Sequence, residues 1–493
     1  MNTVVLTKKI EENVKIISLH VPNNANFKTK ELILKGDVKC YVLYISGISK
    51  KEDIEDHIIT PLLFKIDTDL NNLSSPILEI SRKYLTISNT EISSNIHLIS
   101  EAIKSGKTII LIDNENKVII CDTATSNFKK VANSKIEESI RGENSAFVEV
   151  LPVNIGLIQE KLKNSNLRIE NYVFGDENKC EAALMYMEKS IDPKVLNELK
   201  NKLKKIKASY IPDTGYLSQL LEKNTLTVFP QSKTTEKPDK VISDIIQGKA
   251  AILINGCSYA IVMPVVFIEF FQTFEDYSNR LSLANFDRFI RVIAVIIVVT
   301  FSPIYLVLIK YNAELVPLDL IKIIAASRLG IPIPPFLEII LMEIIIEFLR
   351  EGGLRLPSIV GQTLSIVGGI ILGQAAIQAG IVSPTTLIVI AVTIISTFVI
   401  PNYEMSLSIR LLRFYVLVCA QFLGFFGLAI ALFSIIAHLM NLESLGIPYF
   451  SPFAPMRHSG LKDGIVRYPL RDINRVPVIY KWRKMKNKKN DKK

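Results

Sequence analysis

The sequence contains too few cysteines and histidines, too widely scattered, for a disulfide framework or a metal site. It has five of each in 493 residues. The cysteines are odd in number and never form a CxxC pair; they are Cys40, Cys121, Cys180, Cys257 and Cys419. We therefore expect neither a metal ion nor another cofactor.

A signal peptide and an enzyme site are missing as well. Residues 1–17 mix lysine and glutamate with short apolar pieces, without an apolar core or a cleavage site, so the N-terminal half is expected to stay in the cytoplasm. Ser105 to Thr108 ends like a phosphate-binding loop, but Glu101 stands where its first glycine is required. No pair of acid and base residues and no nucleophile with a histidine emerges. We expect no catalytic residues and no enzyme.

The charge is distributed unevenly. Basic and acidic residues balance over 1–288, and residues 289–452 hold only eight of each. Residues 453–493 hold 13 basic and three acidic residues, so the whole net charge of +10 lies in this tail. A basic tail directly after apolar segments is typical of a cytoplasmic end that faces anionic lipid. We favour this membrane contact over binding to nucleic acid.

Within the first 270 residues one order of signals occurs twice. An apolar strand beside Cys40, followed by a charged helix, has its counterpart beside Cys180. Later, a helix that ends at Gly106 is followed by an apolar strand and a hairpin, and the same order follows Gly248. The offset is 140 residues at the cysteines and 142 at the glycines. This predicts two related α/β subdomains, with a chance likeness of strand–helix–strand patterns as the alternative.

The second half has apolar runs near the ~20 residues that cross a bilayer as a helix. The strong candidates are 289–309, 359–382, 385–400 and 414–440, and two interrupted stretches lie at 316–327 and 336–349. The predicted architecture is a soluble α/β half, a helical multi-span membrane domain with four to six segments, and a basic tail. We expect the units to be 1–140, 141–275, a linker helix at 276–288, 289–440 and 441–493.

The number of crossings stays open between four and six. A cytoplasmic N-terminal half and a cytoplasmic tail require an even number. Four crossings would place Arg410 and Arg413 outside. Six, with the 316–327 or the 414–440 segment divided, would place these arginines and the tail inside, as the positive-inside rule prefers.

Two helix faces in this half are candidate sites. Glu343, Glu347 and Glu351 share one face with Arg350. This face is either a carboxylate-lined vestibule or gate of a cation pathway, or one side of an amphipathic helix in the membrane interface. In 359–382 a face of small and weakly polar residues either packs against another helix or lines a narrow pore in a symmetric oligomer. Its members are Gln362, Ser365, Gly369, Gly373, Ala376 and Gly380.

Several motifs resemble one family. Phe229-Pro230-Gln231 is followed by Thr235-Glu236-Lys237-Pro238-Asp239, and Ser451-Pro452-Phe453-Ala454-Pro455 closes the membrane region. These segments and others between them are similar to the A subunit of the GerA-type spore germination receptors. A sporulation protein of similar layout, the AF product of the stage V sporulation A operon, is the nearest alternative.

The resemblance implies a multi-pass protein of the inner spore membrane that works with a B-type multi-span subunit and a C-type lipoprotein. It implies a homo-oligomer that conducts monovalent cations when nutrient binds, and it favours the pore interpretation of the small-residue face. Two other functions remain: a secondary transporter of a small solute, and a membrane-anchored scaffold for receptor partners.

Overall fold

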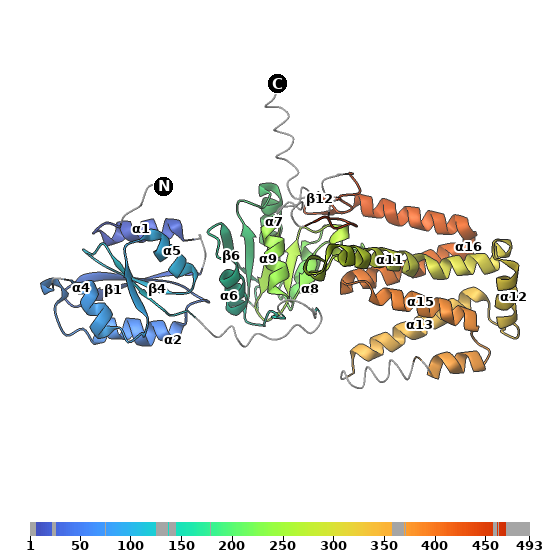
Figure 1. Ribbon diagram of the computed structural model, residues 1–493, viewed down its shortest axis with the longest axis horizontal. Helices are drawn as coiled ribbons and strands as arrows, with labels where there is room; N and C mark the ends of the chain where they lie inside the picture. Colours follow the sequence, from blue (N-terminus) through green and yellow to red (C-terminus); the bar gives the residue numbers. More distant parts are fainter. Residues whose placement is uncertain are drawn as a thin grey trace, which may run out of the picture.

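Two α/β units and a helical region follow one another along the molecule (Figure 1). The computed structural model describes residues 6–21, 26–73, 75–124, 137, 144–177, 179–356, 369, 371–456, 461 and 463–469. The predicted class is confirmed to this extent: the N-terminal region holds two antiparallel five-stranded sheets, and the C-terminal region is helical.

The first unit is a sheet in the order β1-β2-β4-β5-β3 with helices on both faces. One face packs against α1 and α5, and the other against the helical turns that follow β2 and precede β3. All five side chains of β4 are buried, as a strand covered on both sides requires. The elements are α1 (Ile10–His20), β1 (Phe27–Leu34), β2 (Val38–Ile45), α2 (Lys51–Ile54), η1 (Glu55–Ile59), α3 (Thr60–Phe64), η2 (Leu70–Asn72), α4 (Pro76–Glu79), η3 (Ile80–Tyr84), β3 (Thr90–Ser93), α5 (Ile96–Lys104), β4 (Thr108–Ile112) and β5 (Val118–Cys121).

The second unit has the same layout, with the sheet order β6-β7-β9-β10-β8. Here α6 and α9 cover one face, while α7 and α8 lie on the other. The elements are α6 (Leu151–Lys161), β6 (Leu167–Phe174), β7 (Cys180–Met187), α7 (Pro193–Lys205), α8 (Thr214–Leu221), β8 (Lys233–Thr235), α9 (Pro238–Ile246), β9 (Ala250–Ile254) and β10 (Ala260–Met263).

The strand register shows that the two units repeat one another. Cys40 pairs with Ile112 in the first sheet and, 142 residues on, Ala182 pairs with Ile254 in the second. The predicted match of Cys40 with Cys180 is therefore wrong by two residues, because the strand equivalent of Cys40 is Ala182. The predicted relation between the two subdomains is confirmed by the shared strand order.

The glycines that ended the two repeated helices adopt the predicted left-handed backbone. Gly106 has φ +86° and Gly248 has φ +95°. A Cβ atom there would lie 2.5 Å from the Ile48 carbonyl oxygen in the first unit and 2.7 Å from that of Ser190 in the second. Both positions therefore require glycine for conformation and for space.

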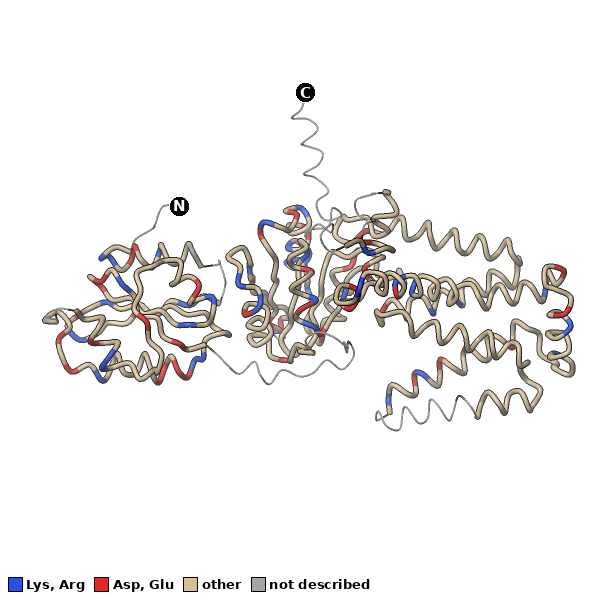
Figure 2. Tube along the Cα trace, viewed as in Figure 1, with Lys and Arg blue, Asp and Glu red and all other residues tan. Residues whose placement is uncertain are grey.

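The helical region contains long apolar helices with few charged side chains along them (Figure 2). Two of them, α11 and α16, are long and apolar enough to cross a membrane, and α15 is shorter. α11 begins within the segment predicted as a linker helix. The elements are η5 (Phe267–Phe271), α10 (Glu275–Ser278), α11 (Leu281–Lys310), η6 (Ala313–Leu315), α12 (Leu318–Ser327), α13 (Pro335–Leu354), a helix over 371–378, α15 (Pro384–Phe398), α16 (Tyr403–Asn441), β11 (Glu443–Ser444) and β12 (Ile447–Pro448).

α16 consists of two helices that run back along each other. Gly424 has φ 59° and ψ −139°, which no α-helix contains. The Tyr415 hydroxyl lies 2.9 Å from the Ser434 hydroxyl, although 19 residues of straight helix would separate them by about 28 Å. The prediction of one span over 414–440 is therefore wrong, since the chain reverses inside it. This is the division that the six-crossing alternative requires.

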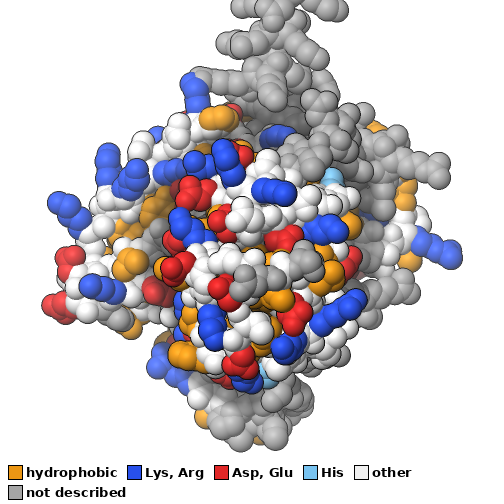
Figure 3. Space-filling model, turned by 90° about the vertical axis from the view of Figure 1, so that its left-hand side faces the viewer, with side chains coloured by type: hydrophobic (Ala, Val, Ile, Leu, Met, Phe, Trp, Pro, Cys, Tyr) orange, Lys and Arg blue, Asp and Glu red, His pale blue; other side chains and the backbone are white. Residues whose placement is uncertain are grey.

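The second α/β unit and the helices share one hydrophobic core. It extends from the sheet through Phe270 and Tyr449 to Met405 and Val416 of α16. The first unit has its own two clusters on either side of its sheet. Its end furthest from the helices carries interspersed acidic and basic side chains (Figure 3), as expected of a surface in water.

Candidate functional site

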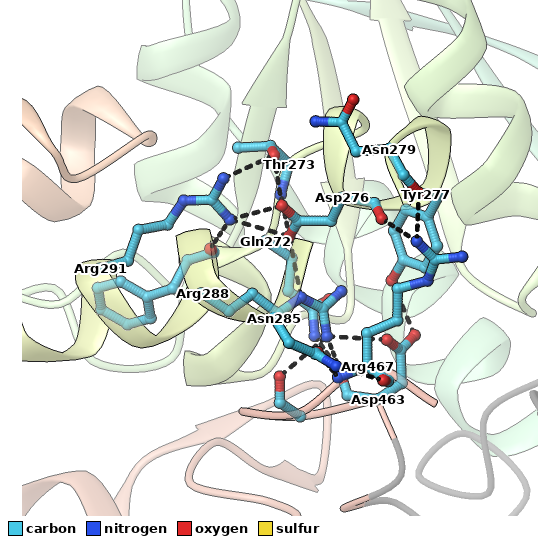
Figure 4. A network of polar contacts seen from close by, with 12 residues as sticks. Gln272, Thr273, Asp276, Tyr277, Asn279, Asn285, Arg288, Arg291, Asp463 and Arg467 are labelled. Atoms are coloured by element: carbon cyan, nitrogen blue, oxygen red, sulfur yellow. Dashed lines mark hydrogen bonds and ion pairs between the residues drawn. The ribbon is translucent and has the colours of Figure 1, made fainter. Parts of the chain in front are cut away.

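A buried polar network joins the second α/β unit to the first membrane helix (Figure 4). Asp276, in α10, is 1% exposed. Its carboxylate accepts hydrogen bonds from Arg288 Nε at 3.0 Å and from Arg291 Nη1 at 2.8 and 2.9 Å, both on the first turns of α11. The Thr273 hydroxyl donates a further bond at 3.0 Å. One carboxylate thus fixes the beginning of α11 to the end of the soluble half.

The C-terminal segment closes this network from the other side. Arg288 Nη1 donates to Asp463 Oδ1 at 3.0 Å, and the Tyr277 hydroxyl donates to Asp463 Oδ2 at 2.7 Å. The Arg467 guanidinium donates to the backbone carbonyls of Asp276 and Asn279. Burial raises the pKa of the Asp463 carboxyl against the opposing effect of Arg288. The tail is therefore tied to the point where the chain first meets the membrane helices.

The predicted acidic face of α13 lies against arginines of α16. Glu343 is 1% exposed and lies 3.3 Å from Arg413 Nε. Glu347 lies 2.8 Å from Arg410 Nη1, 3.8 Å from Arg413 Nη2 and 3.6 Å from Arg350 Nη1. Arg410 and Arg413 thus supply the compensating charge that carboxylates within a helical bundle require.

Glu351 does not belong to this cluster. It is exposed and forms its own ion pair with Arg355, 2.7 Å away. A second buried pair forms in the first turn of α13, where Glu338 accepts from Arg328 Nη1 at 2.5 Å and from the Ser383 backbone N–H at 2.6 Å. The role of the acidic face as a vestibule or gate stays a prediction.

The small-residue face divides into parts with different surroundings. Gln362 and Ser365 lie outside the described residues. A Cβ atom at Gly373 would lie 3.4 Å from Leu387 Cδ2, whereas one at Gly369 would meet open space.

The remaining two members of the small-residue face, Ala376 and Gly380, also differ in their surroundings. Ala376 is half-buried in the cluster that Leu387 joins. Gly380 has φ +63° and follows the helix, so the prediction that it shares the helical face is wrong. On the same helix, Gln374 and Gln378 are exposed.

Sequence reasoning missed most of the charged network. Arg288, Arg291, Arg410 and Arg413 were visible only as flanks of apolar runs, and Asp463 stands within a basic tail. Their partners come from segments up to 176 residues away, which no local pattern reveals. Within the described residues no group of three or more His, Cys, Asp or Glu is arranged to hold a metal ion.

These features define a class. The chain is a membrane protein in which tandem α/β units are joined to apolar helices by a shared core and a buried arginine–aspartate network. Residues 15–479 match the family described as Bacillus/Clostridium GerA spore germination protein. The chain therefore belongs to the GerA family and is a spore germination receptor A subunit.

The similarity to known relatives extends over most of the chain. The chain is 34% identical over 468 residues to Spore germination protein KA of Bacillus subtilis (strain 168), which covers 94% of this chain and 86% of that protein. It is 30% identical over 475 residues to the membrane protein YfkQ of the same organism, covering 96% and 92%. The crystal structure of the N-terminal domain of the A subunit of the Bacillus megaterium germinant receptor GerK3 is similar with a TM-score of 0.43 and 25% identity, covering 54% of this chain and 99% of that one.

Proposed function

We propose that this A subunit assembles with copies of itself in the inner spore membrane and conducts monovalent cations when a nutrient-binding partner opens it. A B-type multi-span subunit and a C-type lipoprotein are the partners. The observation that carries the proposal is the exposure of Gln374 and Gln378 on the helix over 371–378. Amide side chains are costly in hydrocarbon, so this face requires water or another copy beside it.

Six crossings fit this assembly. α11, α13, the helix over 371–378, α15 and the two halves of α16 supply six segments. An even number leaves the α/β units and the basic tail on the same, cytoplasmic side. The contact of Arg467 with α10 supports this arrangement, because it holds the tail against the soluble half.

The buried network supplies a route for gating. Asp276 fixes the soluble half to α11, and α11 in turn packs against α15 and α16 through a common cluster that includes Leu306, Val389 and Leu417. A partner that moves the second α/β unit would therefore displace α11 relative to its neighbours. The Glu343–Arg413 pair lies where α13 and α16 meet and would respond to such a displacement.

The test is to replace single glycines by leucine. Gly369→Leu adds a side chain in open space, so we expect it to change nutrient-triggered potassium release at least severalfold while the abundance of the protein stays normal. Gly373 is buried and its Cβ would already touch Leu387 at 3.4 Å, so the remaining atoms of a leucine side chain there should lower abundance. Gly352→Leu, also in open space but on α13, is the matched control and should change neither.

The assay uses spores that carry this chain as their only A subunit, suspended in rich nutrient medium. Released potassium and protein level are measured on the same sample. Potassium release equal to the parent in Gly369→Leu spores would refute the pore assignment. Normal release from spores whose α/β units are held on a foreign anchor would favour the scaffold.

A further inference from the structure

A large apolar cavity lies within the helical region and is bordered by α13, the helix over 371–378, α15 and the beginning of α16. Its volume is about 1030 Å³. The wall along α13 runs from Met342 to Leu354, a rise of about 18 Å. This is comparable to one leaflet of a hydrocarbon core about 30 Å thick. Ile390 and Ile394 of α15 form the opposite wall.

One end of the cavity is basic. Among the described residues that line it, Arg350 and Arg410 are the charged ones. With Arg413 they form a cluster of three guanidinium groups around the two carboxylates of Glu343 and Glu347. One positive charge is therefore left uncompensated within this cluster. An excess charge that is removed from water costs several kcal/mol unless an anion joins it.

Arg410 carries a further sign of a missing partner. It is 6% exposed, and its Nε atom finds no hydrogen-bond acceptor in the part of the chain that the structure describes. The guanidinium therefore has an unused donor at the wall of an apolar cavity. A phosphate oxygen is an acceptor that guanidinium groups bind well.

The basic end lies at the depth of lipid headgroups. The same end of the cavity includes Leu354 and Tyr403, which also border a polar pocket of the second α/β unit. Next to them Glu404 accepts a hydrogen bond from Thr234 of that unit at 2.9 Å. The arginines thus face the leaflet on the side of the soluble half, and the apolar wall extends from there into the membrane.

We propose that this cavity binds an anionic phospholipid, with an acyl chain along α13 and α15 and the phosphate at Arg350 and Arg410. The apolar length and the single uncompensated positive charge match a monoanionic headgroup with its chain. A second copy of this chain would fill the apolar wall but bring no anion that the structure identifies. Gly369 and Gly373 also line this cavity, so a lipid chain here and a pore along the small-residue face compete for the same space, and the experiment below tests the lipid directly.

The test is quenching of tryptophan fluorescence by brominated lipid. Trp482 is the only tryptophan, so W482F provides a silent background. I394W then reports from the cavity wall, and I296W, at an exposed position of α11, reports from the ordinary lipid boundary. The full chain is placed in vesicles with brominated phosphatidylglycerol or brominated phosphatidylcholine at equal mole fraction.

We expect the I394W variant to be half-quenched at a severalfold lower mole fraction of phosphatidylglycerol than of phosphatidylcholine. For the I296W variant, the ratio of the two half-quenching mole fractions, phosphatidylcholine over phosphatidylglycerol, should be near one. In the I394W variant, Arg350→Gln should bring this ratio close to one. Arg350→Lys should restore part of the preference for phosphatidylglycerol. Arg355→Gln is the matched control: Arg355 is exposed, pairs with Glu351 and does not line the cavity.

Three results of the quenching experiment would overturn the proposal. One is an equal response to both lipids at I394W. Another is I394W fluorescence that neither lipid quenches while I296W is quenched, since another protein surface would then cover the cavity. The third is a preference that survives Arg350→Gln. The single variant Arg350→Gln, purified without any tryptophan change, gives an independent reading: it should retain severalfold less phosphatidylglycerol per chain than Arg355→Gln, and equal amounts would contradict the site.

Discussion

Replacing Asp276 by asparagine should loosen the beginning of α11 from the second α/β unit, and with it the tail segment that Arg288 holds through Asp463. The carboxylate is buried and accepts from Arg288 and Arg291. An asparagine retains one acceptor oxygen but turns an NH₂ group toward the arginines, which have only donors to offer. Two buried guanidinium groups then lose their shared counter-ion.

The size of the effect follows from this geometry. Removing one partner of a buried ion pair costs about 3–5 kcal/mol, because the remaining charge stays uncompensated. At about 1.4 kcal/mol per factor of ten, the open population of the junction should rise roughly 150- to 4,000-fold. Asp463 alone cannot compensate, because Arg288 but not Arg291 reaches it.

Limited digestion with trypsin measures this opening. Arg288 and Arg467 are both buried, so cleavage after them requires the junction to open. When opening and closing are fast, the cleavage rate follows the open population. Mass spectrometry of peptides that end at Arg288 and Arg467 therefore reports the change directly on the full chain in detergent.

The matched control is Glu188→Gln. Glu188 is exposed and forms a surface pair with Arg168 at 2.6 Å, which is worth less than about 1 kcal/mol. Cleavage after Arg467 should be unaffected by this change. Parent-like protection of Arg467 and Arg288 in Asp276→Asn would show that the carboxylate does not hold the junction.

Two further predictions concern single features. Burial raises the pKa of Cys40 and Cys121 to about 12, so at pH 8 only about one thiol in 10⁴ is a thiolate. Iodoacetamide at pH 8 should leave both unmodified in the folded chain and alkylate them in denaturant; alkylation of the folded chain would contradict their burial. In a Cys419→Ser background, the double variant Tyr415→Cys with Ser434→Cys should be joined within one chain by a short bismaleimide, and the single variants should not. A continuous straight α16 would separate these positions by about 28 Å and give no cross-link.

The sequence was sufficient for the repeat and for the membrane class, because both depend on local patterns. A glycine after each amphipathic helix, followed by a short apolar strand, marks Gly106 and Gly248 in both copies. The structure has the same strand order around both. Apolar runs likewise indicate membrane helices from composition alone.

Local pattern was misleading where one run of residues holds two elements. Residues 414–440 contain no Asp, Glu, Lys or Arg and are mostly apolar, so hydropathy showed no boundary at Gly424. The reversal depends on a positive φ at that glycine and on Tyr311 of α11 packing over it. Gly380 is a similar case, since its place on a helical wheel says nothing of where the helix ends.

The sequence by itself determined which side chains are charged, which segments are apolar and that the soluble half is a repeat. Only the tertiary structure decided which charges meet. The acidic face of α13 was recognisable from its spacing, but its compensation by Arg410 and Arg413 required α16 to lie alongside. The tail was recognisable as basic, but its contact with Asp276 required the chain to return to its first membrane helix. Such contacts link distant segments, and the pairing is set by the packing of whole elements rather than by any neighbouring residue.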